Sequence, residues 1–409
     1  MSNKENRHEP GDLAQFQCLP LKAKIRMSTV RIEAWYESWT RFEIENIKTG
    51  KTRFVTMDTR EFGAEPELKE NEWIKSAFSG AVYVSFSGGK DSTVLADICA
   101  RVCQRYGYTL YLLFVNTGLE YPEIQKFVKT YAEWLRTTYE IEVVLDIVRP
   151  EMRFDEVIKK YGYPVISKEV AQKVHDVNTA KKSGYKDSYA LRQFNGTYVS
   201  KNGKKNAFSL ERWKFILDAD FDISHMCCNV MKKKPSKIYE KETGRKVIIG
   251  TLASESKLRK QQWLINGCNA FDKGRPSSQP LSFWTEQDIL HYIKKYDVPY
   301  CPVYGDIVVD LDTGEIDFGD QMNIIDYLGC YEPEDKLKTT GCDRTGCIFC
   351  MFGCHLEKEP NRFQRLKETY PRQYQYCIGG GEMVNGKWQP SKEGLGLGKV
   401  LDYIGVKYE

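Results

Sequence analysis

The sequence predicts an α/β protein: a doubly wound, mostly parallel sheet with a helical N-terminal extension and a Cys-rich metal-binding C-terminal segment. Three observations predict it. From Ala81 onward, short apolar runs alternate with amphipathic runs, a pattern typical of parallel strands joined by helices. A glycine-rich turn joins the first of these strands to the first helix. Four cysteines lie between Cys342 and Cys354, and such density predicts a metal site.

Composition excludes two classes of protein. The 409 residues are 28% charged and 41% hydrophobic, and no apolar run is long enough to span a membrane, so membrane spanning and general disorder are both excluded. The stretch from Met1 to Pro10 has no apolar core, so we expect no secretory signal and a cytoplasmic location. Thirteen cysteines in that compartment are expected to be reduced.

Residues 1–80 are predicted to form a piece of their own. Apolar side chains recur every three or four positions over residues 19–39, which predicts an amphipathic helix starting near Pro20. Two β-prone runs follow within residues 41–62, separated by a turn around Gly50. We interpret this hairpin as an insertion at the edge of the main domain.

Residues 81–300 are predicted to form the nucleotide-binding domain, and residues 301–409 the Cys-rich segment. The expected strands are 81–86, 109–115, 141–148 and 247–250, and the expected helices are 92–106, 122–139 and 285–295. Thr285 caps the last helix, with Asp288 at the capping-box position. Residues 176–206, rich in Lys, Ser, Gly, Asn and Tyr, are predicted to be a mobile excursion.

The glycine-rich turn predicts a phosphate site. It reads S-F-S-G-G-K-D-S from Ser85 to Ser92, between a strand and a helix, where free backbone N–H groups and the helix dipole favour an anion. The predicted phosphate-binding residues are Ser85, Ser87, Gly88, Gly89, Lys90, Asp91 and Ser92. Lys90 and Asp91 are the predicted catalytic residues, with Asp91 as a candidate Mg²⁺ ligand. The spacing is not that of the Walker loop, and a purely structural turn is the alternative.

The charge is unevenly distributed along the chain. Residues 151–260 hold 24 basic and 13 acidic residues, whereas residues 301–340 hold 2 basic and 10 acidic residues. The basic stretch is either a solvated surface or a contact surface for a phosphate-rich partner, which leaves a nucleic acid open as the acceptor.

Cysteine spacing predicts that Cys347 and Cys350 bind a metal, because thiols separated by two residues can reach one soft metal, and Cys227 and Cys228 supply an adjacent pair upstream. Cys342 and Cys354 remain alternatives for completing the set. Spacing does not separate an iron–sulfur cluster from zinc held by four cysteines. Buried cysteines without a ligand role are the interpretation for Cys99 and Cys103.

The S-G-G-K-D-S turn resembles that of N-type ATP pyrophosphatases in the adenine nucleotide alpha-hydrolase superfamily, and the chain resembles its phosphoadenosine phosphosulfate (PAPS) reductase-like family in particular. The stretch F-V-N-T-G from Phe114 is similar to that family's F-V-D-T-G, with Asn116 in place of Asp. The stretch from Gly250 to Arg259 resembles its G-x-R-x-x-E-S-x-x-R segment, with Leu252 in place of the first Arg. The run from Pro280 to Tyr304 is similar to its P-L-x-x-W-T segment.

The resemblance implies an adenine nucleotide held by the turn, with Asn116, Thr117 and Gly118 near the adenosine and with Glu255 and Arg259 at the same site. Sulfonucleotide reductases usually lack the loop lysine and end in an E-C-G-[IL]-H tail. This chain keeps Lys90 and ends Gly405-Val406-Lys407-Tyr408-Glu409, so ATP with Mg²⁺ is the expected ligand.

The cysteines extend the resemblance. The C-C pair at Cys227 together with C-x-x-C at Cys347 resembles the ligand set of iron–sulfur adenylylsulfate reductases. The run R-T-G-C-I-F-C from Arg344 is similar to that of the iron–sulfur ATP pyrophosphatase of DNA phosphorothioation systems. Both comparisons imply a four-iron four-sulfur cluster, with zinc as the alternative.

The expected activity is cleavage of ATP at the α-phosphate, which adenylylates an acceptor for sulfur transfer from a thiol or a sulfur donor protein. A sulfonucleotide reductase that releases sulfite is one alternative. A non-enzymatic regulator that binds nucleotide or nucleic acid is the other. The identity of the acceptor and the oligomeric state stay open.

Overall fold

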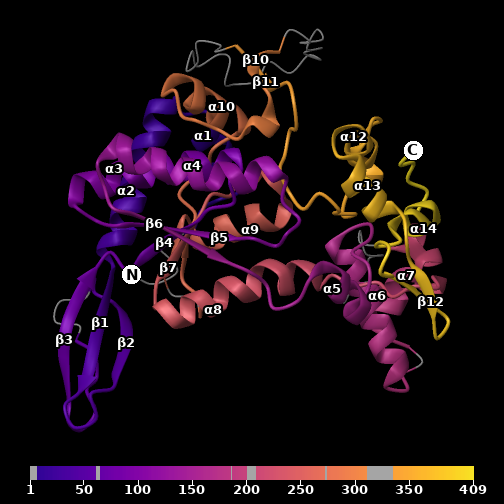
Figure 1. Ribbon diagram of the computed structural model, residues 1–409, viewed down its shortest axis with the longest axis horizontal. Coiled ribbons are helices and arrows are strands. Elements are labelled where there is room, and N and C mark those ends of the chain that lie inside the picture. Colours follow the sequence, from indigo (N-terminus) through magenta and orange to yellow (C-terminus); the bar gives the residue numbers. More distant parts are fainter. Residues whose placement is uncertain (1–6, 61–64, 186, 200–208, 272–273, 311–334) are drawn as a thin grey trace. The chain divides into compact units, whose positions relative to one another are not determined.

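The computed structural model describes residues 7–60, 65–185, 187–199, 209–271, 274–310 and 335–409. Internal contacts divide the chain into two units (Figure 1). The sheet unit comprises residues 1–116, 121–148 and 236–345, and the cysteine unit comprises residues 117–120, 149–235 and 346–409. The two units therefore alternate along the chain, whereas the three predicted pieces are consecutive.

A six-stranded sheet forms the centre of the sheet unit, in the order β6-β5-β4-β7-β9-β8. The first five strands run parallel, and β8 pairs antiparallel with β9. Their bounds are β4 Val82–Ser85, β5 Leu110–Val115, β6 Val143–Val148, β7 Lys246–Ile249, β8 Asn269–Ala270 and β9 Ser277–Ser278. Successive strands extend the sheet first to one side of β4 and then to the other, so the predicted doubly wound, mostly parallel sheet is confirmed.

Helices cover both faces of this sheet because alternate residues of each strand point to opposite sides. In β4, Val82 and Val84 belong to the main apolar core, whereas Tyr83 belongs to a smaller cluster with Tyr239 of α8. The long helices that contribute to the main core include α2 Leu21–Glu37, α3 Lys90–Tyr106, α4 Pro122–Tyr139 and α10 Glu286–Lys295. The opposite face carries α8 (Lys234–Thr243), whose first two residues belong to the cysteine unit.

The N-terminal helix is tied into this core. α2 confirms the helix predicted over residues 19–39, and it follows a short α1 (Asp12–Gln17). Lys24 of α2 forms a buried ion pair with Asp288 of α10, with Nζ 2.7 Å from Oδ2. Asp288 also completes the predicted capping box with Thr285. A helix predicted as an extension therefore serves as a covering layer of the sheet.

A separate three-stranded sheet follows α2, in the order β2-β1-β3. β1 (Trp39–Asn46) and β2 (Thr52–Asp58) form the predicted hairpin. β3 (Glu72–Ser79) pairs antiparallel with the other side of β1, and the sequence did not predict it. The remaining elements of the sheet unit are η3 Ala253–Glu255, α9 Lys257–Asn266, η4 Pro302–Tyr304, β10 Ile307–Val309 and β11 Leu337–Thr339.

The cysteine unit is mainly helical. Its elements are α5 Phe154–Tyr161, α6 Lys168–Lys182, α7 Tyr189–Phe194, η1 Glu211–Asp218, the π-helical turn η2 Asn229–Lys233, η5 Cys354–Leu356, α12 Arg362–Thr369, α13 Pro371–Ile378, β12 Glu382–Val384, β13 Lys387–Gln389 and α14 Leu397–Tyr403.

The predicted mobile excursion over residues 176–206 is wrong where α6 and α7 occupy it. Ser167 and Ser188 cap these helices by accepting hydrogen bonds from the backbone N–H groups of Val170 and Leu191. Buried valines on one side of α6 hold it in place. Residues 186 and 200–208 of the stretch lie outside the described residues.

Within the described part of the chain, every helix falls short of the length and apolarity that crossing a membrane requires.

Candidate functional site

The predicted phosphate loop lies where the order of the strands reverses. β4 and β7 are parallel neighbours, with Ser85 opposite Ile249, so the segments that follow both strands leave the sheet at its carboxyl end. Open α/β sheets bind ligands at such a point. Gly250 packs against the start of α3, where an added Cβ would lie 3.0 Å from the carbonyl oxygen of Asp91. The fold thus brings the loop and the segment leading to Glu255 together.

Two glycines make the turn into α3. Gly88 has φ 72°, and a Cβ there would lie 3.0 Å from methyl groups of both Ile124 and Val128. Gly89 is the N-cap of α3, and a Cβ there would lie 2.9 Å from the Thr345 hydroxyl. Both positions therefore require glycine, one for its backbone conformation and one for space.

Serine hydroxyls line the same turn. The hydroxyl oxygens of Ser87 and Ser92 are 3.0 Å apart, and that of Ser92 also accepts from the Ser87 backbone N–H. Ser92 donates in turn to the carbonyl oxygen of Gly89 at 2.9 Å. Ser85 ends β4 directly before the turn. Hydroxyls and backbone N–H groups are thus concentrated at the N-terminus of α3, an arrangement suited to a phosphate.

Lys90 is buried, with 6% of its surface exposed. Its Nζ lies 2.6 Å from the carbonyl oxygen of Asp343 and 2.9 Å from a carboxylate oxygen of Glu286. Its backbone N–H donates to the Tyr304 hydroxyl, which also shares a hydrogen bond with Thr345. Because Glu286 is exposed, an anionic ligand can replace it beside the ammonium without leaving a buried carboxylate unpaired.

Further charges surround the loop. Glu255 forms ion pairs with Arg259 and with Arg344. Burial lowers the pKa of Arg259, and the positive charge of Arg344 lowers it further. Burial raises the pKa of Asp91, although the charge of Lys90 opposes this rise. Charges of both signs therefore adjoin the loop, as the binding of a phosphate with its counter-ion requires.

The segment after β5 is divided between the units. Asn116 donates its backbone N–H to Val148 at the carboxyl end of the sheet. Thr117 and Gly118 belong to the cysteine unit, where Thr117 donates its backbone N–H and its hydroxyl to the Glu120 carboxylate. Among the predicted nucleotide residues, the structure thus groups Asn116, Glu255 and Arg259 with the loop in the sheet unit.

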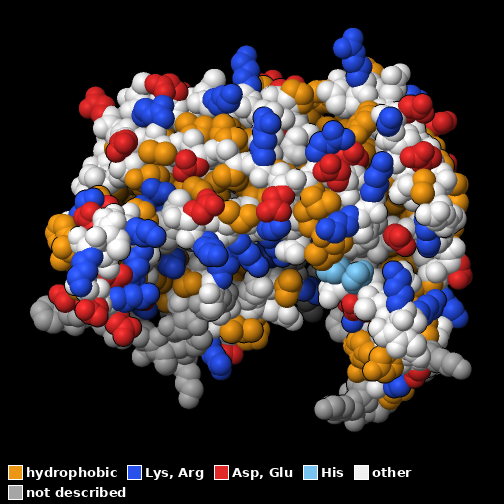
Figure 2. All heavy atoms as spheres, turned by 60° about the horizontal axis from the view of Figure 1, so that its bottom comes forward, with side chains coloured by type: hydrophobic (Ala, Val, Ile, Leu, Met, Phe, Trp, Pro, Cys, Tyr) orange, Lys and Arg blue, Asp and Glu red, His pale blue; other side chains and the backbone are white. Residues whose placement is uncertain are grey.

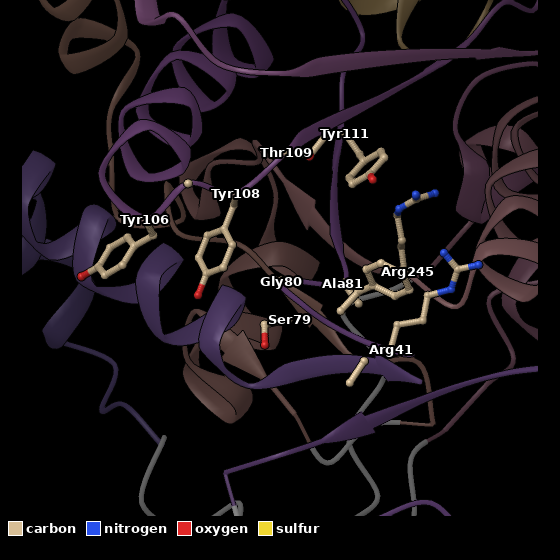
Figure 3. A pocket seen from close by; sticks show the side chains of 12 residues that line it. Arg41, Ser79, Gly80, Ala81, Tyr106, Tyr108, Thr109, Tyr111 and Arg245 are labelled. Atoms are coloured by element: carbon tan, nitrogen blue, oxygen red, sulfur yellow. The ribbon is translucent and has the colours of Figure 1, made fainter. Parts of the chain in front are cut away.

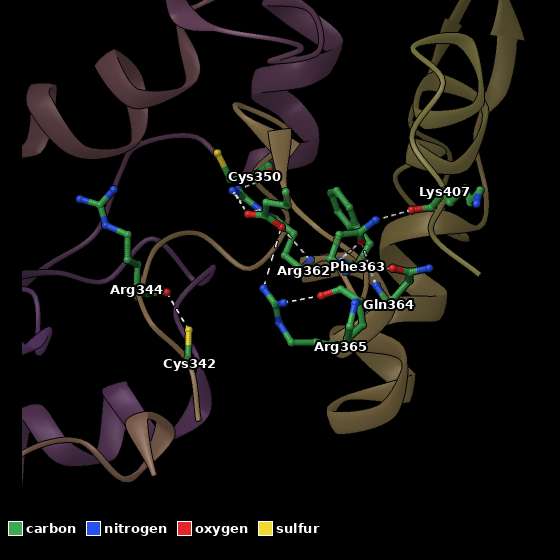
Figure 4. Close-up of polar contacts among 11 residues, drawn as sticks. Cys342, Arg344, Cys350, Arg362, Phe363, Gln364, Arg365 and Lys407 are labelled. Atoms are coloured by element: carbon green, nitrogen blue, oxygen red, sulfur yellow. Dashed lines mark hydrogen bonds and ion pairs between the residues drawn. The ribbon is translucent and has the colours of Figure 1, made fainter. Parts of the chain in front are cut away.

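The four predicted metal ligands all lie in the cysteine unit. The Sγ atoms of Cys227 and Cys228 are 3.9 Å apart, directly before the π-helical turn. Cys347 and Cys350 flank a tight turn in which the Cys350 N–H donates to the Cys347 carbonyl. Arg362 of α12 donates to the Cys350 carbonyl (Figure 4), and it also pairs with Glu357.

The two cysteine pairs are electrostatically coupled. Burial raises the pKa of Cys347 to about 11, and the charges of Cys350 and Cys228 add to the rise. The hydrogen bond from Cys227 lowers the pKa of Cys228. Burial acts to lower the pKa of Lys232, yet Cys347 and other negative groups raise it above its usual value. The four thiols therefore share one environment with a lysine.

Cys354 and Cys342 differ from these four. The Cys354 thiol is buried and donates to the Met351 carbonyl at 3.0 Å. Cys342 belongs to the sheet unit, where its thiol donates to the Arg344 carbonyl (Figure 4). Among the described residues, no three or more His, Cys, Asp or Glu side chains are arranged to hold a single metal ion.

Some basic side chains of residues 151–260 form ion pairs with carboxylates. Lys234 forms an ion pair with Glu151, and Arg192 with Asp187, at exposed positions. Figure 2 shows Lys and Arg side chains interspersed with Asp and Glu over the visible face. Basic and acidic side chains are therefore mixed on the visible face.

Sequence reasoning missed four residues that contact the loop, namely Glu286, Tyr304, Asp343 and Thr345. Tyr304 lies 214 positions from Lys90, so no local pattern connects the two. The only sequence signal for the four missed residues was their position inside or beside segments that resemble the family.

Comparison with protein families supports the resemblance. The family model described as the phosphoadenosine phosphosulfate reductase domain matches residues 81–199 and 186–351, well over half of the chain. A search of curated proteins found no match.

Proposed function

The chain belongs to the phosphoadenosine phosphosulfate reductase domain family, and from this membership we propose that it is an ATP pyrophosphatase that adenylylates an acceptor for sulfur transfer. The family supports a nucleotide-binding enzyme of sulfur metabolism. The observation that carries the finer proposal is the buried Lys90 at the N-terminus of α3, within a turn of glycines and serine hydroxyls.

In the proposed reaction, an acceptor oxygen attacks the α-phosphorus of ATP, and the bond from this phosphorus to the bridging oxygen breaks. Pyrophosphate leaves with the bond electrons, and the acceptor retains AMP. The loop N–H groups and Lys90 stabilise the negative charge that gathers on pyrophosphate. Arg259 and Arg344 supply further positive charge at the same edge of the sheet.

Asp91 is the carboxylate we propose for Mg²⁺. It is the second residue of α3, next to Lys90, and a cation would oppose the effect of burial on its pKa. Mg²⁺ bound between phosphates would neutralise their charge.

We further propose that Cys227, Cys228, Cys347 and Cys350 hold a four-iron four-sulfur cluster. The donor set fits, because four thiols lie in one unit and influence one another's pKa. In such a cluster each thiolate binds a different iron, so the sulfurs need not converge on one ion. The bound cluster would supply electron transfer or a binding point for sulfur, and Lys232 would offset its negative charge. Zinc is the alternative.

The reaction is tested by incubating the protein with ATP labelled at the α- or the γ-phosphate and with candidate nucleic-acid acceptors, in the absence of a sulfur donor. We expect labelled pyrophosphate from the γ-label and labelled acceptor from the α-label, with both lost in Lys90→Ala and retained in Lys129→Ala on the exposed side of α4. Release of inorganic phosphate in place of pyrophosphate would contradict the proposal.

The second candidate is reduction of PAPS to sulfite, which the family description favours. It requires a thiol near the nucleotide, and the Cys342 thiol lies close enough to Tyr304 to contribute to the raised pKa of that residue. In this reaction the thiol takes the sulfo group from the nucleotide, and a second thiol displaces sulfite and forms a disulfide. Sulfite release from PAPS with an added thiol reductant and without ATP, lost in Cys342→Ser, would support this candidate. Binding of nucleotide with no turnover of either substrate would favour a regulator.

The cluster is tested on anaerobically purified protein. We expect about four iron and four sulfide per chain, lost in Cys347→Ser/Cys350→Ser and retained in the control Cys18→Ser, which lies in the sheet unit. One zinc and no iron after anaerobic reconstitution would replace the cluster with a structural zinc site.

A further inference from the structure

A pocket of about 570 Å³ lies in the sheet unit (Figure 3). It lies at the end of the sheet where the parallel strands begin, whereas the glycine-rich turn lies at the end where they finish. Three of its lining residues, Ala81, Thr109 and Arg245, directly precede the parallel strands β4, β5 and β7. Its other wall comes from β1 and β3 of the three-stranded sheet. The pocket is therefore separate from the proposed ATP site, which lies at the carboxyl ends of the same strands.

Two arginines meet in this pocket. Arg41 comes from β1 and Arg245 from the start of β7, and Figure 3 shows their guanidinium groups close to one another. Burial lowers the pKa of Arg41, and the charge of Arg245 lowers it further. Two like charges held together destabilise the protein unless an anion binds between them.

Neither arginine is paired directly with a carboxylate among the described residues, although the charge of Glu43 acts on Arg41. Within the described residues, neither guanidinium forms an ion pair, and the buried Nε of Arg41 has no hydrogen-bond partner. Glu43 on the same strand as Arg41 is engaged elsewhere, by Lys75 at 3.5 Å and by the Ser76 hydroxyl at 3.0 Å.

An aromatic ring stacks on the flat face of each guanidinium group. The Arg41 group lies 3.7 Å from the centre of the Phe54 ring, and the Arg245 group 3.5 Å from that of Tyr111. Stacking occupies the flat face of a guanidinium and leaves the N–H groups at its edge available for an oxyanion. One N–H group of Arg245 donates to the Tyr239 hydroxyl at 3.2 Å.

Tyrosine rings line the remaining wall. Tyr106 stacks on Tyr108, and Tyr108 stacks on Tyr36, with ring centres 5.9 and 5.3 Å apart. Gly80 gives Tyr108 its space, since a Cβ there would lie 3.0 Å from the ring. Figure 3 shows Tyr108 between Tyr106 and the two arginines, so these rings form a wall apart from the guanidinium groups.

We propose that this pocket is a second ligand site, which binds a phosphate group between Arg41 and Arg245. A free nucleotide and a single-stranded nucleic acid share this chemistry. The site does not depend on the proposed ATP reaction.

Lys90→Ala protein isolates the pocket from the loop in the test. Its binding of AMP, of inorganic phosphate and of a fluorescein-labelled ten-residue oligothymidylate is measured by calorimetry and fluorescence anisotropy. Adding Arg41→Gln and Arg245→Gln should weaken binding of all three ligands at least ten-fold. Adding Tyr106→Ala should leave the binding of all three ligands unchanged, because Figure 3 shows this ring apart from the two arginines.

Lys22→Gln/Lys48→Gln is the matched control, because it removes two exposed charges of the same unit outside the pocket. Equal binding by the arginine variant and this control would overturn the proposal, as would failure of the Lys90→Ala protein to bind any of the three ligands. Oligonucleotide binding that is tighter than AMP binding and falls steeply with salt identifies a nucleic acid strand, and equal affinities identify a free nucleotide. If the arginine variant does not fold, phenylglyoxal modification of Arg41 and Arg245 in Lys90→Ala protein, mapped by mass spectrometry, must slow when ligand is added.

Discussion

The sheet unit and the cysteine unit hold their candidate sites by different means. In the sheet unit, Lys90 contacts Asp343, Glu286 and Tyr304. Its ammonium and its backbone N–H group therefore both have protein partners. In the cysteine unit, four thiols cluster in turns, and each acts on the pKa of its neighbours. Thiolates so placed repel one another unless a metal binds them. The first site is organised by the fold, and we propose that the second depends on a bound metal.

The largest effect is expected from breaking the buried ion pair between Lys24 and Asp288. Lys24→Met leaves a buried carboxylate without its partner, which should lower the free energy of unfolding of the sheet unit by about 3–5 kcal/mol. Chemical denaturation measures this change, with the exposed Lys22→Met as control. A loss as small as that of the control would show that the pair contributes little.

Glycine substitutions compare the two units directly. Gly88→Ala should destabilise by about 1–2 kcal/mol for its left-handed backbone and by about 1–3 kcal/mol more for its contacts with Ile124 and Val128. Gly353→Ala in the cysteine unit has φ 77° but no heavy atom within 4 Å of its Cβ, so only the first cost applies. Thermal unfolding of both variants measures the difference. Equal losses would mean that the loop adapts to the added methyl group.

Metal removal should affect the units unequally. After chelation, we expect faster amide hydrogen exchange at Ile348, Cys350 and Gly353, whose N–H groups bond within the cysteine unit. The amides of β4, β5 and β7 should keep their protection. Hydrogen exchange with mass spectrometry tests this, and loss of protection in all strands would show that the sheet also depends on the metal.

The smallest effect is expected from Tyr304→Phe. This change removes the hydroxyl that accepts from the Lys90 N–H, while the ring remains. A hydrogen bond of this kind is worth about 1 kcal/mol, so ATP should bind about two- to ten-fold more weakly. Calorimetry measures it, and tighter binding would mean that the hydroxyl competes with the phosphate.

Local sequence signals predicted most of the sheet unit. Runs such as Leu110–Val115 identify buried strands, and Thr285 with Asp288 identifies a helix start. β8 and β9 have two residues each, too few for a periodic pattern. β3 was missed because its side chains are mostly exposed, so apolar alternation is weak. The residues around Lys90 could not be predicted, because chain segments more than 190 positions apart supply them.

The alternation of the units along the chain limits how the protein can be dissected. The chain passes from one unit to the other after Asn116, Glu120, Val148, Pro235 and Thr345. Neither unit is a contiguous gene fragment. A truncation after Thr345 would keep the Cys227–Cys228 pair and discard Cys347 and Cys350, leaving half of a donor set on a partial unit. Separate expression of the nucleotide and cysteine sites therefore requires rejoining the segments of each unit with new linkers.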